Sequence, residues 1–314
     1  MRRNPNTITC LLPAYNEEKN ISYVIKESYI FLKKYCSDVE ILVVDDGSTD
    51  ETVNIVKSLA GFYPISLVKL SRNFGKEIAI SAGLDNAQGD VVIIMDSDGQ
   101  HPLHVIDQFI ELWRDGYDMV YGVRKNRDSE SIIKRNVTTL YYYVMDRISD
   151  IHIPPNAGDF RLMNHNVVEA LKSLPERTRM MKGLYAWVGF KSKAVTFEVE
   201  DRLSGNSTFN FYNLASLAMT GLTSFSSAPL KVWMLVGLVI SSFSFFYGLI
   251  ILLKTLFLGS QVPGWPTLTI AIFFLGGIQL LSIGIIGDYI SRVFNEVKNR
   301  PLYIIEEYKK SSDI

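Results

Sequence analysis

Two carboxylates, Asp96 and Asp98, directly follow the apolar run at residues 91–95, and their spacing points to metal chemistry. An apolar run of this length is typical of a buried strand, and side chains two positions apart lie on the same side of a strand. Carboxylate oxygens suit Mg²⁺ or Mn²⁺, and Mg²⁺ usually keeps one or two carboxylates plus substrate phosphates as ligands. The pair therefore indicates a metal site for a diphosphate leaving group. A solvated turn is the alternative.

Two more polar clusters follow apolar runs. Asp45 and Asp46 end the run that begins at residue 41, and adjacent carboxylates suit the donor groups of a sugar or a base. Helix capping explains the residues after Gly47 but does not explain these two carboxylates. Tyr15 and Glu17 follow the first run, and a stacking ring beside a carboxylate suits a nucleoside. The start of a helix is the alternative interpretation for that pair.

A basic cluster and an acid–base pair complete the candidate residues. The basic residues are Arg124, Lys125, Arg127, Lys134 and Arg135. A run of charge is usually a solvated face, but in a membrane-anchored protein it suits anionic headgroups or a lipid phosphate. Asp159 and Arg161 flank Phe160 further along the chain, and a structural ion pair between the two is as good an explanation as a site.

The scaffold that must position these residues is predicted from alternating patterns. Apolar runs bounded by turn residues predict strands at 8–12, 41–44, 65–70, 91–95 and 119–121, with helices at 17–35, 50–60, 76–87 and 103–114. Strands alternating with helices predict an α/β fold with a mostly parallel sheet covered on both faces. Ligands of such sheets bind beyond the carboxyl ends of the strands, so the polar clusters are expected to share one pocket.

The carboxyl-terminal part of the chain predicts a membrane protein. Residues 232–253 and 265–287 carry no charge, and each segment exceeds the roughly 20 residues that span a bilayer. Basic residues flank the pair of segments while the connector at 259–264 has none, which predicts cytoplasmic ends for both. Helical apolar stripes at 131–149 and 210–227 favour interfacial helices, although the first could equally cover the sheet.

The predicted organisation has four parts. A cytoplasmic catalytic domain occupies 1–209, an amphipathic interfacial helix 210–229, a two-helix transmembrane hairpin 230–290 and a cytoplasmic tail 291–314. The last residues, 306–314, are expected to fray. The net charge of −1 gives no support to a nucleic-acid partner, and Cys10 and Cys36 are expected to be reduced.

The ordered motifs resemble glycosyltransferase family 2, and within it the polyprenyl-phosphate sugar transferases. They are PAYNE at 13–17, DDGS at 45–48, RNFGKE at 72–77, DSDGQHP at 96–102 and GDFRLM at 158–163, followed by the paired apolar segments. The pattern is most similar to bacterial bactoprenol glucosyltransferases and more distantly to dolichyl-phosphate mannose synthases. The chain departs from the family's pattern at Gly99, Leu103 and His104, and Thr208 stands where relatives often carry lysine.

The resemblance implies a GT-A fold and inverting transfer of a hexose, glucose from UDP-glucose being the best match, to undecaprenyl phosphate. Mg²⁺ or Mn²⁺ would be the cofactor. The implied place is the cytoplasmic face of the bacterial inner membrane, and the product would serve O-antigen or other envelope glycans. A homo-oligomer, a downstream flippase and a glycan-modifying transferase are the implied protein partners.

The resemblance also implies a role for each candidate residue. Nucleotide-sugar binding falls to Pro13, Tyr15, Glu17, Asp45, Asp46, Lys76 and Asp96, and metal binding to Asp96, Asp98 and Gln100. Lipid-phosphate binding falls to Arg124, Lys134, Arg135 and Arg202, and catalysis to Asp159, Arg124 and Arg135. The acceptor phosphate has a second pKa of about 6 and needs no general base, so Asp159 is expected to orient the sugar or an arginine.

Other functions stay open at this point. The sugar or the lipid could differ, as in the dolichyl-phosphate mannose synthases. A processive polysaccharide synthase would need more spans than the two predicted. A non-catalytic membrane scaffold could bind the nucleotide sugar, but the presence of both Asp96 and Asp98 argues against it.

Overall fold

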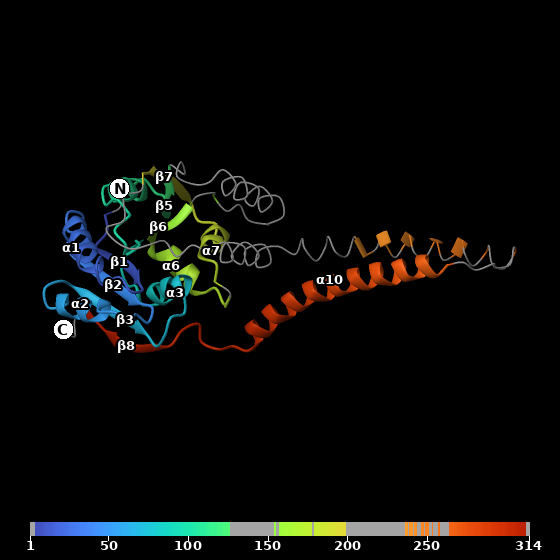
Figure 1. Cartoon of the computed structure of the whole chain (residues 1–314). Coiled ribbons are helices and arrows are strands. Elements are labelled where there is room, and N and C mark those ends of the chain that lie inside the picture. Colours follow the sequence, from blue (N-terminus) through green and yellow to red (C-terminus); the bar gives the residue numbers. More distant parts are fainter. Residues whose placement is uncertain are drawn as a thin grey trace.

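The computed structural model describes residues 4–125, 154, 157–177, 179–198 and 264–311, with isolated residues between 236 and 257. These residues form an α/β domain from which one long helix extends (Figure 1). Both predicted interfacial helices, at 131–149 and 210–227, lie outside the described residues, as does half of the first apolar segment at 232–253.

A mixed sheet of eight strands forms the centre of the described domain, in the order β7-β5-β6-β4-β1-β2-β3-β8. The strands are β1 (Thr7–Ala14), β2 (Asp38–Asp45), β3 (Ile65–Leu70), β4 (Val91–Ile94), β5 (Met119–Arg124), β6 (Ala157–Asn164), β7 (Ser192–Phe197) and β8 (Ile305–Lys309). The pairs β1–β2, β1–β4, β2–β3 and β5–β7 are parallel, and β3–β8, β4–β6 and β5–β6 are antiparallel. The predicted α/β fold is confirmed, but the sheet is mixed, because three of its seven strand pairings are antiparallel.

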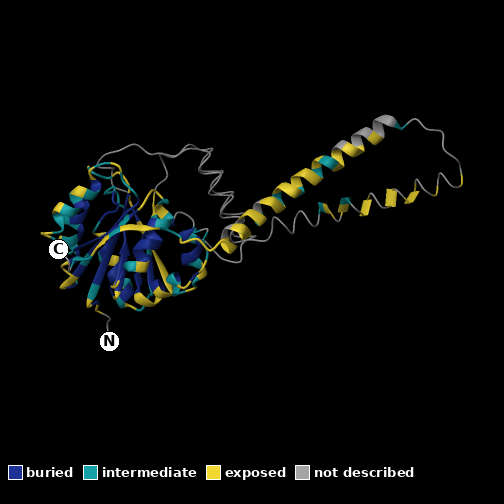
Figure 2. Ribbon diagram, turned by 90° about the horizontal axis from the view of Figure 1, so that it is seen from below, coloured by how far each residue is buried: buried dark blue, intermediate teal, exposed yellow. Residues whose placement is uncertain are grey.

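Helices cover both faces of this sheet. They are α1 (Ile21–Leu32), α2 (Thr52–Leu59), α3 (Lys76–Asn86), α4 (Val105–Arg114), α6 (His165–Lys172) and α7 (Met181–Trp187). Helices α1, α2 and α4 contribute to one apolar cluster, and α3, α6 and α7 to the other. Because neighbouring strand residues point to opposite faces, Leu12 of β1 packs into the first cluster and Leu11 into the second. Figure 2 shows the resulting buried sheet between its two layers.

The carboxyl-terminal tail is not frayed as expected. Strand β8 pairs antiparallel with β3 at the edge of the sheet. Glu307 lies 2.6 Å from the Nζ of Lys57, and Glu306 lies 3.0 Å from the Nζ of Lys69. The prediction for residues 306–309 was wrong because the partner strand lies more than two hundred residues away, so no local pattern reveals it.

Helix α10 (Trp265–Val297) extends away from the domain with most of its described side chains exposed (Figure 2). Its segment Phe274–Ser291 is long and apolar enough to cross a membrane, judged by length and composition. Among the described residues this is one candidate span, where the sequence predicts two.

Candidate active site

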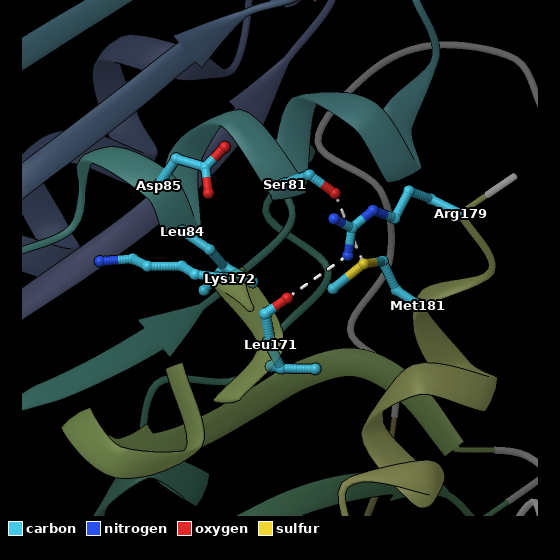
Figure 3. Close-up of a pocket in the computed structure, with 7 residues that line it drawn as sticks. All are labelled: Ser81, Leu84, Asp85, Leu171, Lys172, Arg179 and Met181. Atoms are coloured by element: carbon cyan, nitrogen blue, oxygen red, sulfur yellow. Dashed lines mark hydrogen bonds between the residues drawn. The ribbon is translucent and has the colours of Figure 1, made fainter. Parts of the chain in front are cut away.

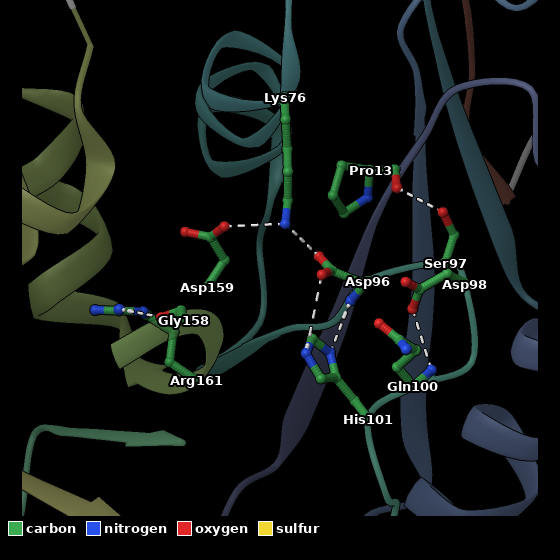
Figure 4. Close-up of polar contacts among 10 residues, drawn as sticks. All are labelled: Pro13, Lys76, Asp96, Ser97, Asp98, Gln100, His101, Gly158, Asp159 and Arg161. Atoms are coloured by element: carbon green, nitrogen blue, oxygen red, sulfur yellow. Dashed lines mark hydrogen bonds and ion pairs between the residues drawn. The ribbon is translucent and has the colours of Figure 1, made fainter. Parts of the chain in front are cut away.

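The turn after β4 carries the two predicted metal-binding carboxylates and is held at three points (Figure 4). The Ser97 hydroxyl donates to the carbonyl oxygen of Pro13 at 2.7 Å. The Gln100 N–H donates to Asp98 Oδ1 at 3.1 Å. The Asp96 N–H donates to Nδ1 of His101 at 3.0 Å. These contacts tie Asp96, Asp98 and Gln100 to one another and to the end of β1.

Lys76 joins this turn to strand β6. Its Nζ lies 2.6 Å from Asp96 Oδ1 and 3.0 Å from Asp159 Oδ2 (Figure 4). The Lys76 side chain is 46% exposed, whereas those of Asp96 and Asp159 are 19% and 10% exposed. The aliphatic stem of the lysine therefore lies at the surface, and its ammonium reaches inward between two largely buried carboxylates.

The ion pairs set the charge states of all three groups. Burial opposes the charge of Lys76, but Asp159 and Asp96 outweigh it and raise the lysine pKa. Burial alone would raise the pKa values of Asp96 and Asp159, but the ammonium of Lys76 dominates and lowers both. All three groups are charged at neutral pH, so the cluster is a buried ion triad.

Asp46 fixes the loop that delivers Lys76. Its two carboxylate oxygens accept the N–H groups of Phe74 at 2.7 Å and Gly75 at 2.9 Å, directly before α3 begins at Lys76. Gly47 lies against this loop with a φ of 72°, and a Cβ there would come within 2.4 Å of the backbone of Arg72. Only glycine fits this close approach without strain.

The other predicted nucleotide-binding residues lie beyond the same edge of the sheet. Asp45 ends β2, and its Oδ2 accepts the Ser48 N–H at 3.2 Å. Tyr15 follows β1 and is 46% exposed. Glu17 accepts a hydrogen bond from the Asn20 amide at 2.8 Å. The loops after β1 and β2 are joined directly, because the Asp46 N–H donates to the Ala14 carbonyl at 2.8 Å. The polar clusters predicted to converge thus lie together.

The alternative of a structural pair between Asp159 and Arg161 is not what the structure describes. The ion pair of Asp159 is with Lys76. The buried Arg161 guanidinium instead lies 3.3 Å from the ring centroid of Tyr185 and donates to the Gly158 carbonyl at 2.6 Å. Arg161 therefore holds the backbone directly before Asp159, and it also packs against Tyr185 of α7.

Two residues of this cluster, Glu77 and His101, were not singled out from the sequence. Glu77 Oε2 accepts the Met181 N–H at 2.7 Å, and burial together with Asp159 raises its pKa to about 7. His101 stacks on Phe160, with centroids 4.5 Å apart and planes 8° from parallel, and burial lowers its pKa. Both residues stand inside the RNFGKE and DSDGQHP motifs, and that position was the available signal.

The predicted lipid-phosphate residues are described only in part. Arg124 ends β5 with an exposed side chain, and its charge contributes, after larger effects, to the low pKa of Asp96. Lys134, Arg135 and Arg202 lie outside the described residues.

The donor set of the turn fits a hard divalent cation. Asp96 and Asp98 supply carboxylate oxygens and Gln100 an amide oxygen. Across the described ranges, no group of three or more His, Cys, Asp or Glu side chains is placed to hold a metal ion without help. A cation at this turn would therefore complete its shell with substrate phosphate and water, as Mg²⁺ commonly does.

A separate small pocket lies between α3, α6 and the segment before α7 (Figure 3). Its lining residues are Ser81, Leu84, Asp85, Leu171, Lys172, Arg179 and Met181. Arg179 donates to the carbonyl of Leu171, and Ser81 to the sulfur of Met181. The pocket includes none of the carboxylates around Lys76, so it is not the predicted site.

The fold and the site define a GT-A-like glycosyltransferase. Residues 9–172 match Glycosyl transferase family 2, and residues 228–293 match the GtrB C-terminal hairpin. The chain belongs to glycosyltransferase family 2.

Individual relatives match over nearly the whole chain. An uncharacterized glycosyltransferase of Synechocystis sp. is 46% identical over 96% of this chain and 95% of its own length. The SfII prophage-derived bactoprenol glucosyl transferase of Shigella flexneri is 44% identical over 96% of this chain and 97% of its own length. A structure of glucosyl-3-phosphoglycerate synthase from Mycobacterium tuberculosis matches with a TM-score of 0.47 and 21% identity, over 68% of this chain and 76% of that one.

Proposed function

We propose that this protein transfers glucose from UDP-glucose to undecaprenyl phosphate with inversion at the anomeric carbon. The observation that carries the proposal is the 44% identity, over almost all of both chains, to a bactoprenol glucosyl transferase. The buried triad of Lys76, Asp96 and Asp159 at the carboxyl edge of the sheet supports a site for an anionic donor.

The donor half of the site is assigned to the residues around the first three polar clusters. Pro13, Tyr15, Glu17, Asp45 and Asp46 hold the nucleoside. Lys76 and Asp96 face the diphosphate and the sugar. Asp96, Asp98 and Gln100 would hold Mg²⁺ or Mn²⁺, which would supply Lewis-acid stabilisation of the departing diphosphate.

The acceptor half is assigned to the basic residues. Arg124, Lys134, Arg135 and Arg202 grip the lipid phosphate. A phosphate oxygen forms a bond to the anomeric carbon as the bond from that carbon to the diphosphate breaks, and UDP leaves with that electron pair. The acceptor is mostly dianionic at neutral pH and loses no proton, so Asp159 orients the sugar through Lys76 rather than acting as a base.

The membrane part brings the acceptor to this site. We place the catalytic domain and both termini in the cytoplasm, an interfacial helix at 210–229 and a two-helix hairpin at 230–290. The match of residues 228–293 to a C-terminal hairpin and the apolar segment Phe274–Ser291 support this arrangement. A homo-oligomer, a flippase and a glycan-modifying transferase are the proposed protein partners.

A transfer assay tests the proposal. Full-length protein in detergent receives undecaprenyl phosphate, Mg²⁺ or Mn²⁺ and one of a panel of radiolabelled nucleotide sugars, and the lipid fraction is counted. We expect label from UDP-glucose, lost with chelator and in Asp98→Asn. Label from another donor would change the sugar. No label from any donor, in folded protein that binds nucleotide, would refute the lipid-phosphate acceptor and favour a scaffold.

A further inference from the structure

We infer that Lys76 is a tethered cation that neutralises Asp96 and Asp159 before ligands bind and thereby makes divalent-cation binding depend on the nucleotide. This inference rests on the proposed function, because it takes the turn at Asp96 as the metal site. It assigns Lys76 a role before the donor arrives, in addition to contact with the donor.

The geometry gives Lys76 this role. One ammonium lies within 3.0 Å of both Asp96 Oδ1 and Asp159 Oδ2, and both carboxylates are largely buried. The other oxygen of Asp159 is buried without a hydrogen-bond partner in the described part of the chain. Removing one partner of a buried ion pair leaves an uncompensated charge, which is strongly destabilising. Lys76 is thus the cation that keeps two facing carboxylates compatible when no ligand is bound.

The same contact opposes a metal ion that enters alone. Such a metal ion must share Asp96 with the ammonium of Lys76, which Asp159 keeps nearby. The metal ion is therefore repelled by a like charge at the carboxylate that should bind the metal. A nucleoside diphosphate removes this conflict, because its phosphate oxygens can pair with the ammonium and with the metal ion together. Lys76 can follow the diphosphate without movement of α3, since its stem is at the surface and 46% of the side chain is exposed.

Thermodynamic linkage turns this competition into a measurable coupling. If the nucleotide raises metal affinity, the metal raises nucleotide affinity by the same factor. Replacing Lys76 by a neutral side chain leaves two carboxylates facing each other, which favours a divalent cation with or without nucleotide. The coupling should therefore shrink, because metal binding in the absence of nucleotide becomes tighter.

The test measures Mn²⁺ binding rather than turnover. Full-length wild type, Lys76→Met, Lys76→Arg and the control Lys172→Met are titrated with Mn²⁺, with and without UDP, and free Mn²⁺ is followed by electron paramagnetic resonance. Lys172 pairs with Glu169 on α6 and lines the separate pocket, not the site around Lys76, so its loss should leave Mn²⁺ binding unchanged. We expect Lys76→Met to bind Mn²⁺ without UDP at least tenfold more tightly than wild type, and Lys76→Arg to behave like wild type.

Three outcomes would overturn the inference. One is a Lys76→Met protein that binds Mn²⁺ without UDP no more tightly than wild type. Another is a Lys76→Arg protein that shows the same gain as Lys76→Met. If Lys76→Met does not fold, the wild-type titration decides: equal Mn²⁺ affinity with and without nucleoside diphosphate refutes the coupling. Coupling to GDP instead of UDP would overturn the proposed donor, but this inference would stand. Failure of transfer to the lipid would overturn the proposed acceptor, and this inference would again stand.

Discussion

Glu77 gives the sharpest prediction about pH and stability, because burial raises its pKa from 4.5 to about 7. Between pH 4.5 and about pH 7, Glu77 holds a proton in the folded protein that it has released in the unfolded chain. The free energy of unfolding therefore falls as the pH rises through this window. The difference of about 2.5 pKa units corresponds to ~3 kcal/mol of stability lost by pH 8.

The substitution Glu77→Gln removes this titration while keeping an oxygen that can accept the Met181 N–H. We expect the stability of the variant relative to wild type to increase by about 2–3 kcal/mol between pH 5 and pH 8. For a chain of this size that is a relative rise in Tm of roughly 5–10 °C. Thermal unfolding of the detergent-solubilised protein, followed by intrinsic fluorescence at pH 5, 6, 7 and 8, measures it.

An exposed glutamate provides the matched control. Glu169 is paired with Lys172, which lowers the pKa of Glu169, so the stabilising effect of its charge is present at neutral pH and lost in acid. Glu169→Gln should therefore show no gain over wild type at pH 8. If Glu77→Gln and wild type gave parallel curves of Tm against pH, the argument that Glu77 is protonated in the fold would fail.

Two further substitutions and one deletion test the supports of the site and the edge of the sheet. Asp46→Asn leaves one carbonyl oxygen to accept the N–H groups of Phe74 and Gly75, and each hydrogen bond to the charged carboxylate is worth about 1.5–3 kcal/mol. The KM for the sugar donor should therefore rise more than kcat falls. An unchanged KM would disprove this. Gly47→Ala, at a φ of 72° and against Arg72, should lower stability by roughly 1–3 kcal/mol, and an unaltered Tm would contradict it. Deleting residues 303–314 should expose the edge of β3, lower Tm and promote aggregation on size-exclusion chromatography, and a monodisperse protein of wild-type Tm would count against β8 as a structural strand.

The first half of the chain could be predicted because its signals are local. The strands at 8–12, 41–44 and 91–95 are continuous apolar runs, as expected where both faces of a parallel sheet are covered. They pair parallel to one another, which places their carboxyl ends at one edge of the sheet. The convergence of the polar clusters follows from these two facts.

The elements that were missed depend on distant partners. Strand β6 runs antiparallel between β4 and β5, and β7 and β8 pair with strands far away in the chain. Strand β8 has the sequence IEEYK, whose two adjacent glutamates resemble a solvated tail. Their charges are accommodated because Lys57 and Lys69 belong to the neighbouring α2 and β3, and no sequence window contains both sides of those contacts.

The roles of neighbouring residues were harder to predict than their location. Asp45 and Asp46 are equivalent in the sequence, yet Asp46 holds the backbone at Phe74 and Gly75 while Asp45 holds the turn at Ser48. The difference arises because successive positions point in different directions where a strand ends. Asp46 consequently controls Lys76 without touching it. A substitution at Asp46 should therefore weaken donor binding even if Asp46 never contacts the nucleoside.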